Sequence, residues 1–443
     1  MNRGNRQGIA LAPPLESAED LEYYLLRQRS PALSALSFPS EMVLPNYELS
    51  IANLPATLAA ILGAQLPGAE PPLPAALWAD LAEGVQRVVW VLFDAVGWFA
   101  LRNLLAQEGE MGLAGLAHRG RLMPITSVYP TTTTSALTTL WTGYAPARHG
   151  LVGHMMYLRE YGLIADMLML SPSGAAQRDE LPARGLDLQT FLPVPGLAEA
   201  LAPQGVVTCS LINVDLARTG FSRLCFRGVA ETVRFVAIGD LCVLLRQALR
   251  AHKHERQLLV AYLAEPDSVG HLQGAETDAW AANMRALDCA LQREFLDALT
   301  PEERRGTLVV MTADHGQLPG KGSPVILSGH RELWDDILLP ATGSLRAAYL
   351  YARQGRLEAA ERYLHERLAE QFFTVRSIDA LRAGLLGPGE PARETPYRLG
   401  DLVVTARDNY LLDYRQRTHL PQGLHAGLEA VETLVPFLVA RLD

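Results

Sequence analysis

The sequence predicts an α/β fold, a three-layer αβα sandwich with a mostly parallel central sheet and a small inserted α+β subdomain. Apolar runs at residues 88–93, 258–263 and 307–311 contain no charged side chain, as expected for strands buried on both faces of a sheet. Helical patterns separate these runs along the chain, which favours parallel strands joined by crossover helices. An aspartate follows shortly after each run. Open α/β sheets build their sites at these carboxyl ends of strands.

Composition limits the partners and the compartment. The chain has 443 residues, a formal charge of -9 and a pI near 5.7, which argues against a nucleic-acid polymer as partner because phosphate binding needs a basic face. No apolar run approaches the roughly 18 residues of a membrane span, and the amino terminus lacks the apolar stretch of a signal peptide. We therefore expect a cytoplasmic protein that does not bind a membrane.

The cysteines are few and show no CxxC spacing. They indicate neither a disulfide framework nor a cysteine zinc site, and we expect buried reduced thiols. The four are Cys209, Cys225, Cys242 and Cys289.

The elements follow in order along the chain. Residues 1–80, rich in Pro, Leu and Ala, are expected to form a peripheral segment; residues 81–330 and 415–443 form the core, and residues 331–414 an inserted βαββ subdomain. Predicted core strands are 88–93, 122–128, 206–212, 258–263 and 307–311, and predicted core helices are 98–107, 134–142, 196–202, 231–251 and 276–298. The insert is expected to hold strands at 345–351, 401–406 and 409–414 and a helix at 356–371.

Asp267 and His271 form the first of two segments that combine carboxylate with imidazole. Their i, i+4 spacing places both on one face if the chain turns helically after the strand at 258–263. Gly270 between them allows another backbone segment to approach closely.

Asp314 and His315 form the second segment, directly after the strand at 307–311. Adjacent residues diverge on a regular element, so these two need the strand end and Gly316 to converge on one metal ion. With Asp94 after the strand at 88–93, the two segments look like the halves of a bimetallic site. Mixed imidazole and carboxylate ligands suit zinc best.

A hydroxyl-rich segment at 129–143 combines Pro, four threonines, a helical run and a terminal Gly. It presents a hydroxyl at a helix amino terminus, where free N–H groups and the dipole favour an anion. The alternative is that these hydroxyls only cap the helix, and Thr131 is expected to make only turn or capping contacts. The metal motifs elsewhere favour the chemical role.

These motifs occur in the order Asp94, the threonine segment, Asp267 with His271, Asp314-His315-Gly316, and His425 within Gly423–Gly427. The ordered set resembles the alkaline phosphatase superfamily, and most closely its nucleotide pyrophosphatase/phosphodiesterase-like branch, over about residues 85–440. The resemblance implies hydrolysis of a small phosphate ester such as a nucleotide, with two Zn²⁺ ions, or Mn²⁺ as the alternative metal.

The resemblance also assigns roles to residues. One metal would be held by Asp94, Asp314 and His315 with the oxygen of Thr133, and the other by Asp267, His271 and His425. Thr133 would be the nucleophile that forms a phosphothreonine intermediate; the register of the threonine run leaves Thr132 and Thr134 as alternatives.

Two departures from the branch affect the substrate. The position of an Asn that donates to a phosphate oxygen falls on His154, whose imidazole N–H could replace that donor. The helix directly after Thr133 lacks the Arg with which alkaline phosphatases grip a monoester dianion, which favours phosphodiesters. The rival interpretations are a phosphonate hydrolase or phosphomutase relative with the same metals, and a degenerate, non-catalytic binding module.

Overall fold

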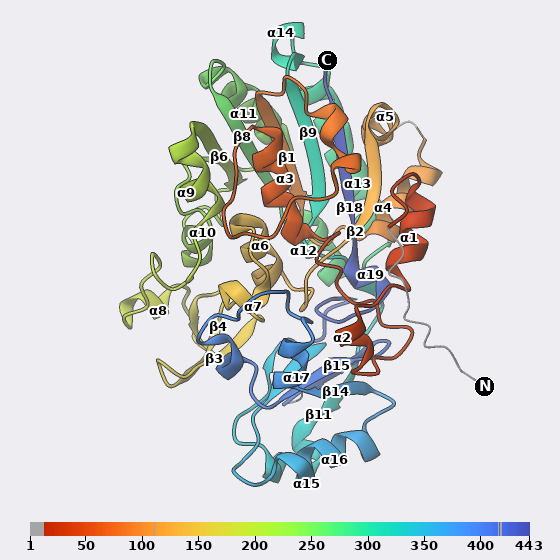
Figure 1. Cartoon of the computed structure of the whole chain (residues 1–443), viewed down its shortest axis with the longest axis vertical. Helices are drawn as coiled ribbons and strands as arrows, with labels where there is room; N and C mark the ends of the chain where they lie inside the picture. Colours follow the sequence, from red (N-terminus) through yellow and green to blue (C-terminus); the bar gives the residue numbers. More distant parts are fainter. Residues whose placement is uncertain (1–12, 110, 415, 417–418) are drawn as a thin grey trace, which may run out of the picture.

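The computed structural model describes residues 13–109, 111–414, 416 and 419–443, and it has the predicted α/β architecture (Figure 1). All five predicted core strands are present in one seven-stranded sheet. Its order is β2 (Arg121–Thr126), β18 (Leu434–Arg441), β9 (Thr307–Ala313), β1 (Arg87–Phe93), β8 (Arg256–Leu263), β6 (Val206–Asn213) and β7 (Glu231–Phe235). The strands from β9 to β7 are parallel, and β18 runs antiparallel to both of its neighbours.

The centre of this sheet is apolar because its strands are covered on both faces. Every residue of β1 and of β9 is buried, as the uninterrupted apolar runs predict. One face carries α4 (Trp98–Gln107), α5 (Gly112–Arg119), α11 (Ile238–Ala251) and α13 (Asp278–Ala290). The other carries α3 (Leu54–Ile61), α6 (Thr133–Thr142), α9 (Leu197–Leu201) and α10 (Gly220–Cys225).

One predicted helix is too long at its start. Residues 231–235 form the edge strand β7, paired in parallel with β6, and α11 begins only at Ile238. The carboxylate of Asp240 accepts hydrogen bonds from the backbone N–H groups of Val236 and Ala237, which fixes the helix start there. The charged residues of β7 resemble a helix in sequence because an edge strand is exposed.

A second, smaller sheet forms the lower part of the molecule in Figure 1. Its antiparallel strands are, in order, β14 (Phe372–Arg376), β15 (Leu402–Ala406), β13 (Ala347–Leu350), β12 (Thr342–Gly343), β3 (Met155–Leu158), β4 (Leu163–Asp166) and β5 (Ser171–Pro172). The hairpin that follows α6 thus shares a sheet with residues 342–406. Because strands from outside residues 331–414 belong to the same sheet, these limits of the inserted subdomain stay a prediction.

Two further elements complete this part. The predicted helix at 356–371 ends earlier, because α16 covers Leu357–Arg367 and residues 368–371 form a turn that leads into β14. The strand predicted at 409–414 is β16 (Tyr410–Asp413), which pairs outside the small sheet with β11 (Ser323–Ile326).

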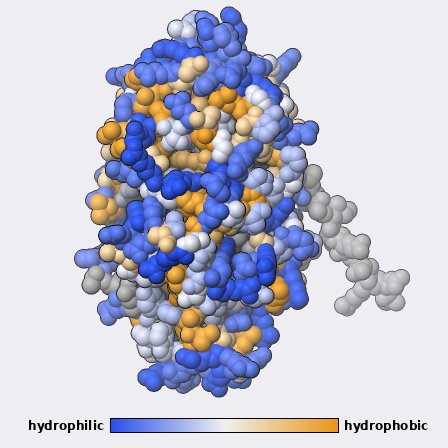
Figure 2. Space-filling view, turned by 90° about the vertical axis from the view of Figure 1, so that its left-hand side faces the viewer, coloured by the Kyte–Doolittle hydropathy of each residue, from blue (hydrophilic) through white to orange (hydrophobic). Residues whose placement is uncertain are grey.

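The surface and the cysteines can be compared with what the sequence predicts. Hydrophobic residues lie interspersed with hydrophilic ones on the face that Figure 2 shows. Among the described residues, the structure contains no helix that is both long and apolar enough to cross a membrane. Three cysteines are buried and unpaired as expected, but Cys289 is exposed because it lies on the outer side of α13.

Candidate active site

The candidate site lies at the carboxyl ends of three adjacent central strands. Phe93 of β1 pairs with Ala313 of β9 and with Leu263 of β8. The residues that follow these strands therefore emerge side by side, as the rule for open α/β sheets predicts.

Asp94, Asp314 and His315 form one fully or almost fully buried group, with one possible ligand atom from each within 4.8 Å of the others. Nε2 of His315 lies 3.6 Å from Oδ1 of Asp94 and 3.4 Å from Oδ2 of Asp314. These two carboxylate oxygens receive no hydrogen bond from the described residues. Buried polar atoms normally have partners, so both oxygens are ready to accept a cation.

The charges in this group repel one another. Burial raises the pKa of Asp94 well above its ordinary value, and the negative charges of Asp314 and Asp267 raise it further. Burial also raises the pKa of Asp314, against the opposing influence of His315. A divalent cation would remove this penalty.

Asp267, His271 and His425 form the second group, also within 4.8 Å of one another. Asp267 and His271 lie on α12 (Glu265–Gln273), and Nε2 of His271 is 3.3 Å from Oδ1 of Asp267, so the predicted helical face is present. His425 comes from the far end of the chain, with its Nε2 3.2 Å from Nε2 of His271.

The three imidazoles are held by the same kind of contact. Nδ1 of each lies within hydrogen-bond distance of a backbone carbonyl: His271 with Gly423 at 2.8 Å, His315 with Gly316 at 3.0 Å and His425 with Thr131 at 3.0 Å. With its proton on Nδ1, each neutral ring directs the Nε2 lone pair into the site, and two such nitrogens face each other. Two lone pairs cannot hydrogen-bond each other, so the residues fit a metal ion.

His425 is held in the neutral form that a metal needs. Burial lowers its pKa well below the ordinary value, and the neighbouring His315 and His271 lower it further. The two groups together supply three carboxylates and three imidazoles, a donor set that suits zinc.

Thr133 is the first residue of α6, and its Oγ1 lies 3.2 Å from Nε2 of His315. Thr132 is the N-cap residue, but its side chain makes no capping hydrogen bond. The Thr134 hydroxyl is fully buried and has no hydrogen-bond partner among the described residues. Helix capping therefore does not account for these hydroxyls.

Thr131 makes more contacts than the expected turn or capping bonds. Its hydroxyl donates to the carbonyl of Gly427 and accepts from the N–H of Ala426, while its own carbonyl contacts Nδ1 of His425. This threonine fixes the loop that carries His425.

His154 lies just before β3 at the rim of the site. Its Nε2 is 3.3 Å from Oδ2 of Asp166 in β4. Burial raises the pKa of Asp166, but the hydrogen bond and charge of His154 oppose it and the net shift is downward. Both residues line a cavity of about 390 Å³, together with Thr132, His271 and His425.

A second, smaller pocket of about 180 Å³ is lined by Thr133. Asp94 and Asp267 lie in its wall. The remaining lining is largely apolar and aromatic, and it includes Leu137, Trp141, Phe221, Phe226 and Tyr262.

Sequence reasoning missed two residues that hold the candidate ligands. The hydroxyl of Tyr262 donates to Oδ2 of Asp94, and Nε2 of Gln317 donates to Oδ1 of Asp267 at 2.6 Å. Gln317 could have been noticed, because it follows the Asp314-His315-Gly316 motif. Tyr262 carried no signal, since an aromatic residue in a buried strand is ordinary.

The comparisons with known proteins agree with this geometry. The family model described as type I phosphodiesterase / nucleotide pyrophosphatase matches residues 88–167 and 223–427, more than half of the chain. The chain belongs to this family. All the candidate ligands, Thr133 and His154 lie within the matched residues. As a type I phosphodiesterase / nucleotide pyrophosphatase family member, the protein is a hydrolase of phosphoester bonds, which excludes the non-catalytic interpretation.

Solved structures confirm the fold. Phosphonoacetate hydrolase from Sinorhizobium meliloti 1021 superposes with a TM-score of 0.59 at 18% identity, over 81% of this chain and 90% of that chain. Human ectonucleotide pyrophosphatase/phosphodiesterase 5 gives 0.59 at 15% identity, over 80% and 87%. Both belong to the alkaline phosphatase superfamily that the motifs indicate. No curated protein matches the sequence significantly.

The buried charge of Asp94 predicts a trade between stability and activity. In protein stripped of metal by a chelator, Asp94→Asn should raise Tm by a few degrees, because the change removes repulsion with Asp314 and keeps an oxygen for Tyr262. Since its folded pKa is raised, the metal-free wild type should lose stability as pH rises from about 4, and the variant should lose less. Zinc should stabilise the wild type more than the variant, and the variant should be almost inactive.

Thermal unfolding followed with and without chelator checks this, with the exposed Asp335→Asn as matched control. If metal-free Asp94→Asn protein melts at a lower temperature than metal-free wild type, repulsion between the Asp94 and Asp314 carboxylates does not destabilise the fold.

The two donor groups also predict a metal content. Wild-type protein should hold two more zinc ions per chain than a double variant, Asp314→Asn with His425→Ala, which loses one ligand from each group. Elemental analysis of both proteins after identical zinc loading and desalting measures this difference. Equal metal content would mean that these groups do not bind metal.

Proposed function

We propose that the protein is a phosphodiesterase that acts through a phosphothreonine intermediate on Thr133 at a two-zinc site. The observation that carries this proposal is the position of the Thr133 hydroxyl, 3.2 Å from Nε2 of His315, in the wall of the smaller pocket and directly after Thr132, which lines the larger cavity. An inactive threonine-to-alanine variant of the murine ectonucleotide pyrophosphatase/phosphodiesterase 5 has been solved with AMP, which supports a threonine in this role.

The reaction divides into two displacements at phosphorus. The Thr133 oxygen attacks phosphorus as the bond to the leaving alkoxide breaks, and the proton that Thr133 loses ends on this alkoxide, which leaves as an alcohol. Water then attacks the phosphothreonine and releases the Thr133 oxygen. Bound zinc ions at the two groups would lower the pKa of the Thr133 hydroxyl and stabilise charge on the leaving oxygen.

The start of α6 would bind the transferring phosphoryl group. The first-turn N–H groups of a helix have no intrahelical acceptor and lie at the positive end of the dipole, so they favour phosphate oxygens. Thr133 opens this turn. The nucleophile and the anion-binding groups thus come from the same element.

His154 would donate a hydrogen bond to a phosphate oxygen. Asp166 contacts its Nε2 and would fix the ring orientation, which leaves Nδ1 for the substrate. The side chain is 37% exposed, so it can reach a ligand in the larger cavity. In this role His154 replaces the amide donor of the family branch.

The two cavities would hold the two ester groups of a diester. The narrower pocket, with Trp141, Phe226 and Tyr262, suits a planar aromatic group such as a nucleobase. The wider cavity continues toward the small sheet through Thr342 and Arg346. A phosphonate is the second candidate substrate, because a structural neighbour is a phosphonoacetate hydrolase.

The nucleophile is tested by a matched pair of threonine variants. Thr133→Val should lower kcat about 10³-fold or more, because it removes the reactive oxygen and keeps the branched shape. Thr134→Val should keep kcat and stability near wild type, since the hydroxyl it removes has no hydrogen-bond partner in the described part of the chain. Thr133→Ser should retain measurable activity.

Steady-state kinetics with bis-p-nitrophenyl phosphate measures these effects. A chiral phosphorothioate substrate adds a test, because two successive in-line displacements retain configuration at phosphorus. Inversion would show direct attack by water and leave Thr133 as a ligand only.

The substrate class gives a separate prediction. Bis-p-nitrophenyl phosphate should have a higher kcat/KM than p-nitrophenyl phosphate, because no Arg follows Thr133 to pair with the second charge of a monoester. Parallel assays with zinc and with manganese, including phosphonoacetate, distinguish the candidates. A clear preference for the monoester would contradict the diester assignment, and turnover of phosphonoacetate alone would favour the phosphonate hydrolase.

A further inference from the structure

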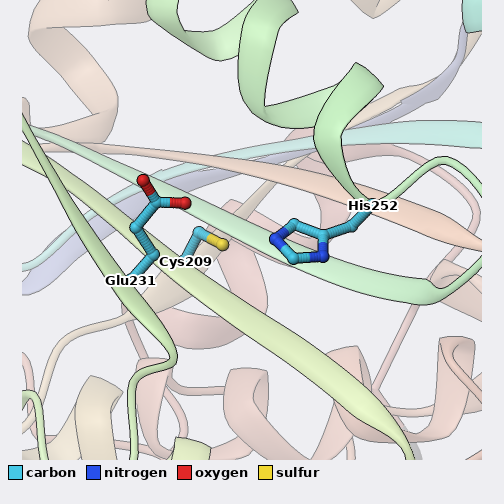
Figure 3. A group of neighbouring side chains, drawn as sticks. All are labelled: Cys209, Glu231 and His252. Atoms are coloured by element: carbon cyan, nitrogen blue, oxygen red, sulfur yellow. The ribbon is translucent and has the colours of Figure 1, made fainter.

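Cys209, Glu231 and His252 meet at a point away from the catalytic end of the main sheet (Figure 3). Cys209 lies in the first half of β6, Glu231 opens β7, and His252 caps the carboxyl end of α11. One donor atom from each lies within 4.8 Å of the others. The catalytic groups follow the opposite ends of the parallel strands, so this cluster is separate from them.

The fold brings these three residues together in a simple way. Cys209 and Glu231 are paired in register on adjacent parallel strands, so both side chains point to the same face of the sheet. The helix α11 covers that face and delivers His252. Thiol, carboxylate and imidazole are all zinc ligands, and each comes here from a different element.

The imidazole of His252 is oriented for binding. Its Nδ1 lies 2.9 Å from Oε1 of Glu255, which leaves Nε2 as the free nitrogen. Figure 3 shows a ring nitrogen of His252 facing the sulfur of Cys209. A histidine whose other nitrogen donates to a carboxylate is the usual arrangement around zinc.

The surrounding charge also favours a cation. Burial and then the negative charges of Glu231 and Glu255 raise the pKa of the Cys209 thiol to about 11. A divalent ion bound between Cys209, Glu231 and His252 would displace the thiol proton.

We propose that Cys209, Glu231 and His252 bind a zinc-class divalent cation, with Glu255 orienting the imidazole. The site is structural, because it ties the edge strand β7 and the neighbouring β6 to the end of α11. Glu231 is exposed, so water can complete the coordination. Sequence spacing could not show this site, since its ligands are far apart and follow no CxxC pattern.

The test uses Co²⁺ added to the chelator-stripped full-length protein. Thiolate ligation of Co²⁺ gives a sulfur-to-metal charge-transfer absorption in the near ultraviolet, and neither catalytic group contains a cysteine. Once the added Co²⁺ exceeds what the two catalytic groups bind, the wild type should show this band with the intensity of one thiolate ligand per chain, and Cys209→Ser should not show it. Cys289→Ser, which removes the exposed thiol on α13, is the matched control and should keep the band.

Two surface variants complete the test. His252→Ala and Glu231→Gln should weaken Co²⁺ binding at this site at least about tenfold, the typical cost of a changed metal ligand shell. They should leave kcat of the zinc-loaded enzyme near wild type. If Cys209→Ser does not fold, these two variants still test the proposed cation site. A wild type without the band, or a band that survives Cys209→Ser, would overturn the proposal, and neither result bears on the phosphodiesterase chemistry.

Discussion

The buried carboxylates of Asp94 and Asp314 repel each other and need a compensating positive charge. The other residues at this end of the sheet are arranged around that need. The apolar strands β1 and β9 bring both groups out of water, where their charges repel and the pKa of each is raised. A protein can relieve such a pair with a proton or with a cation. The neighbouring donors favour the cation, because His315 directs a lone pair at the same point and each carboxylate keeps an oxygen that no described residue hydrogen-bonds.

The backbone next to two candidate ligands adopts an unusual conformation that helps to position the site. Ala95 and Ala426, each directly after a candidate ligand, adopt positive φ angles of 59° and 100°. Residues other than glycine rarely adopt this backbone conformation, and such strain concentrates at functional sites. At Ala95 it directs the N–H to Oδ1 of Asp314 at 3.0 Å. At Ala426 it directs the N–H to the hydroxyl of Thr131.

The sequence predicts the parts of this site that depend on local pattern. Strand ends located Asp94 and Asp314, and helical spacing paired Asp267 with His271. The choice of Thr133 as nucleophile within the threonine run needed the family resemblance. Contacts between distant segments were beyond such reasoning. Tyr262 on Asp94 has no local signature, and edge strand β7 resembles a helix because exposed strands and exposed helices use similar residues.

Another contact between distant segments couples the small sheet to the catalytic centre. Arg346, beside β13, and Glu432 are both fully buried and form a bidentate ion pair at 2.8 Å. Glu432 also accepts the N–H of Gly427, in the loop that carries His425. Breaking such a buried pair leaves an uncompensated charge, at a typical cost of about 3–5 kcal/mol. Arg346 also lines the larger cavity, so the wall of this cavity and the loop that carries His425 are positioned by the same two side chains.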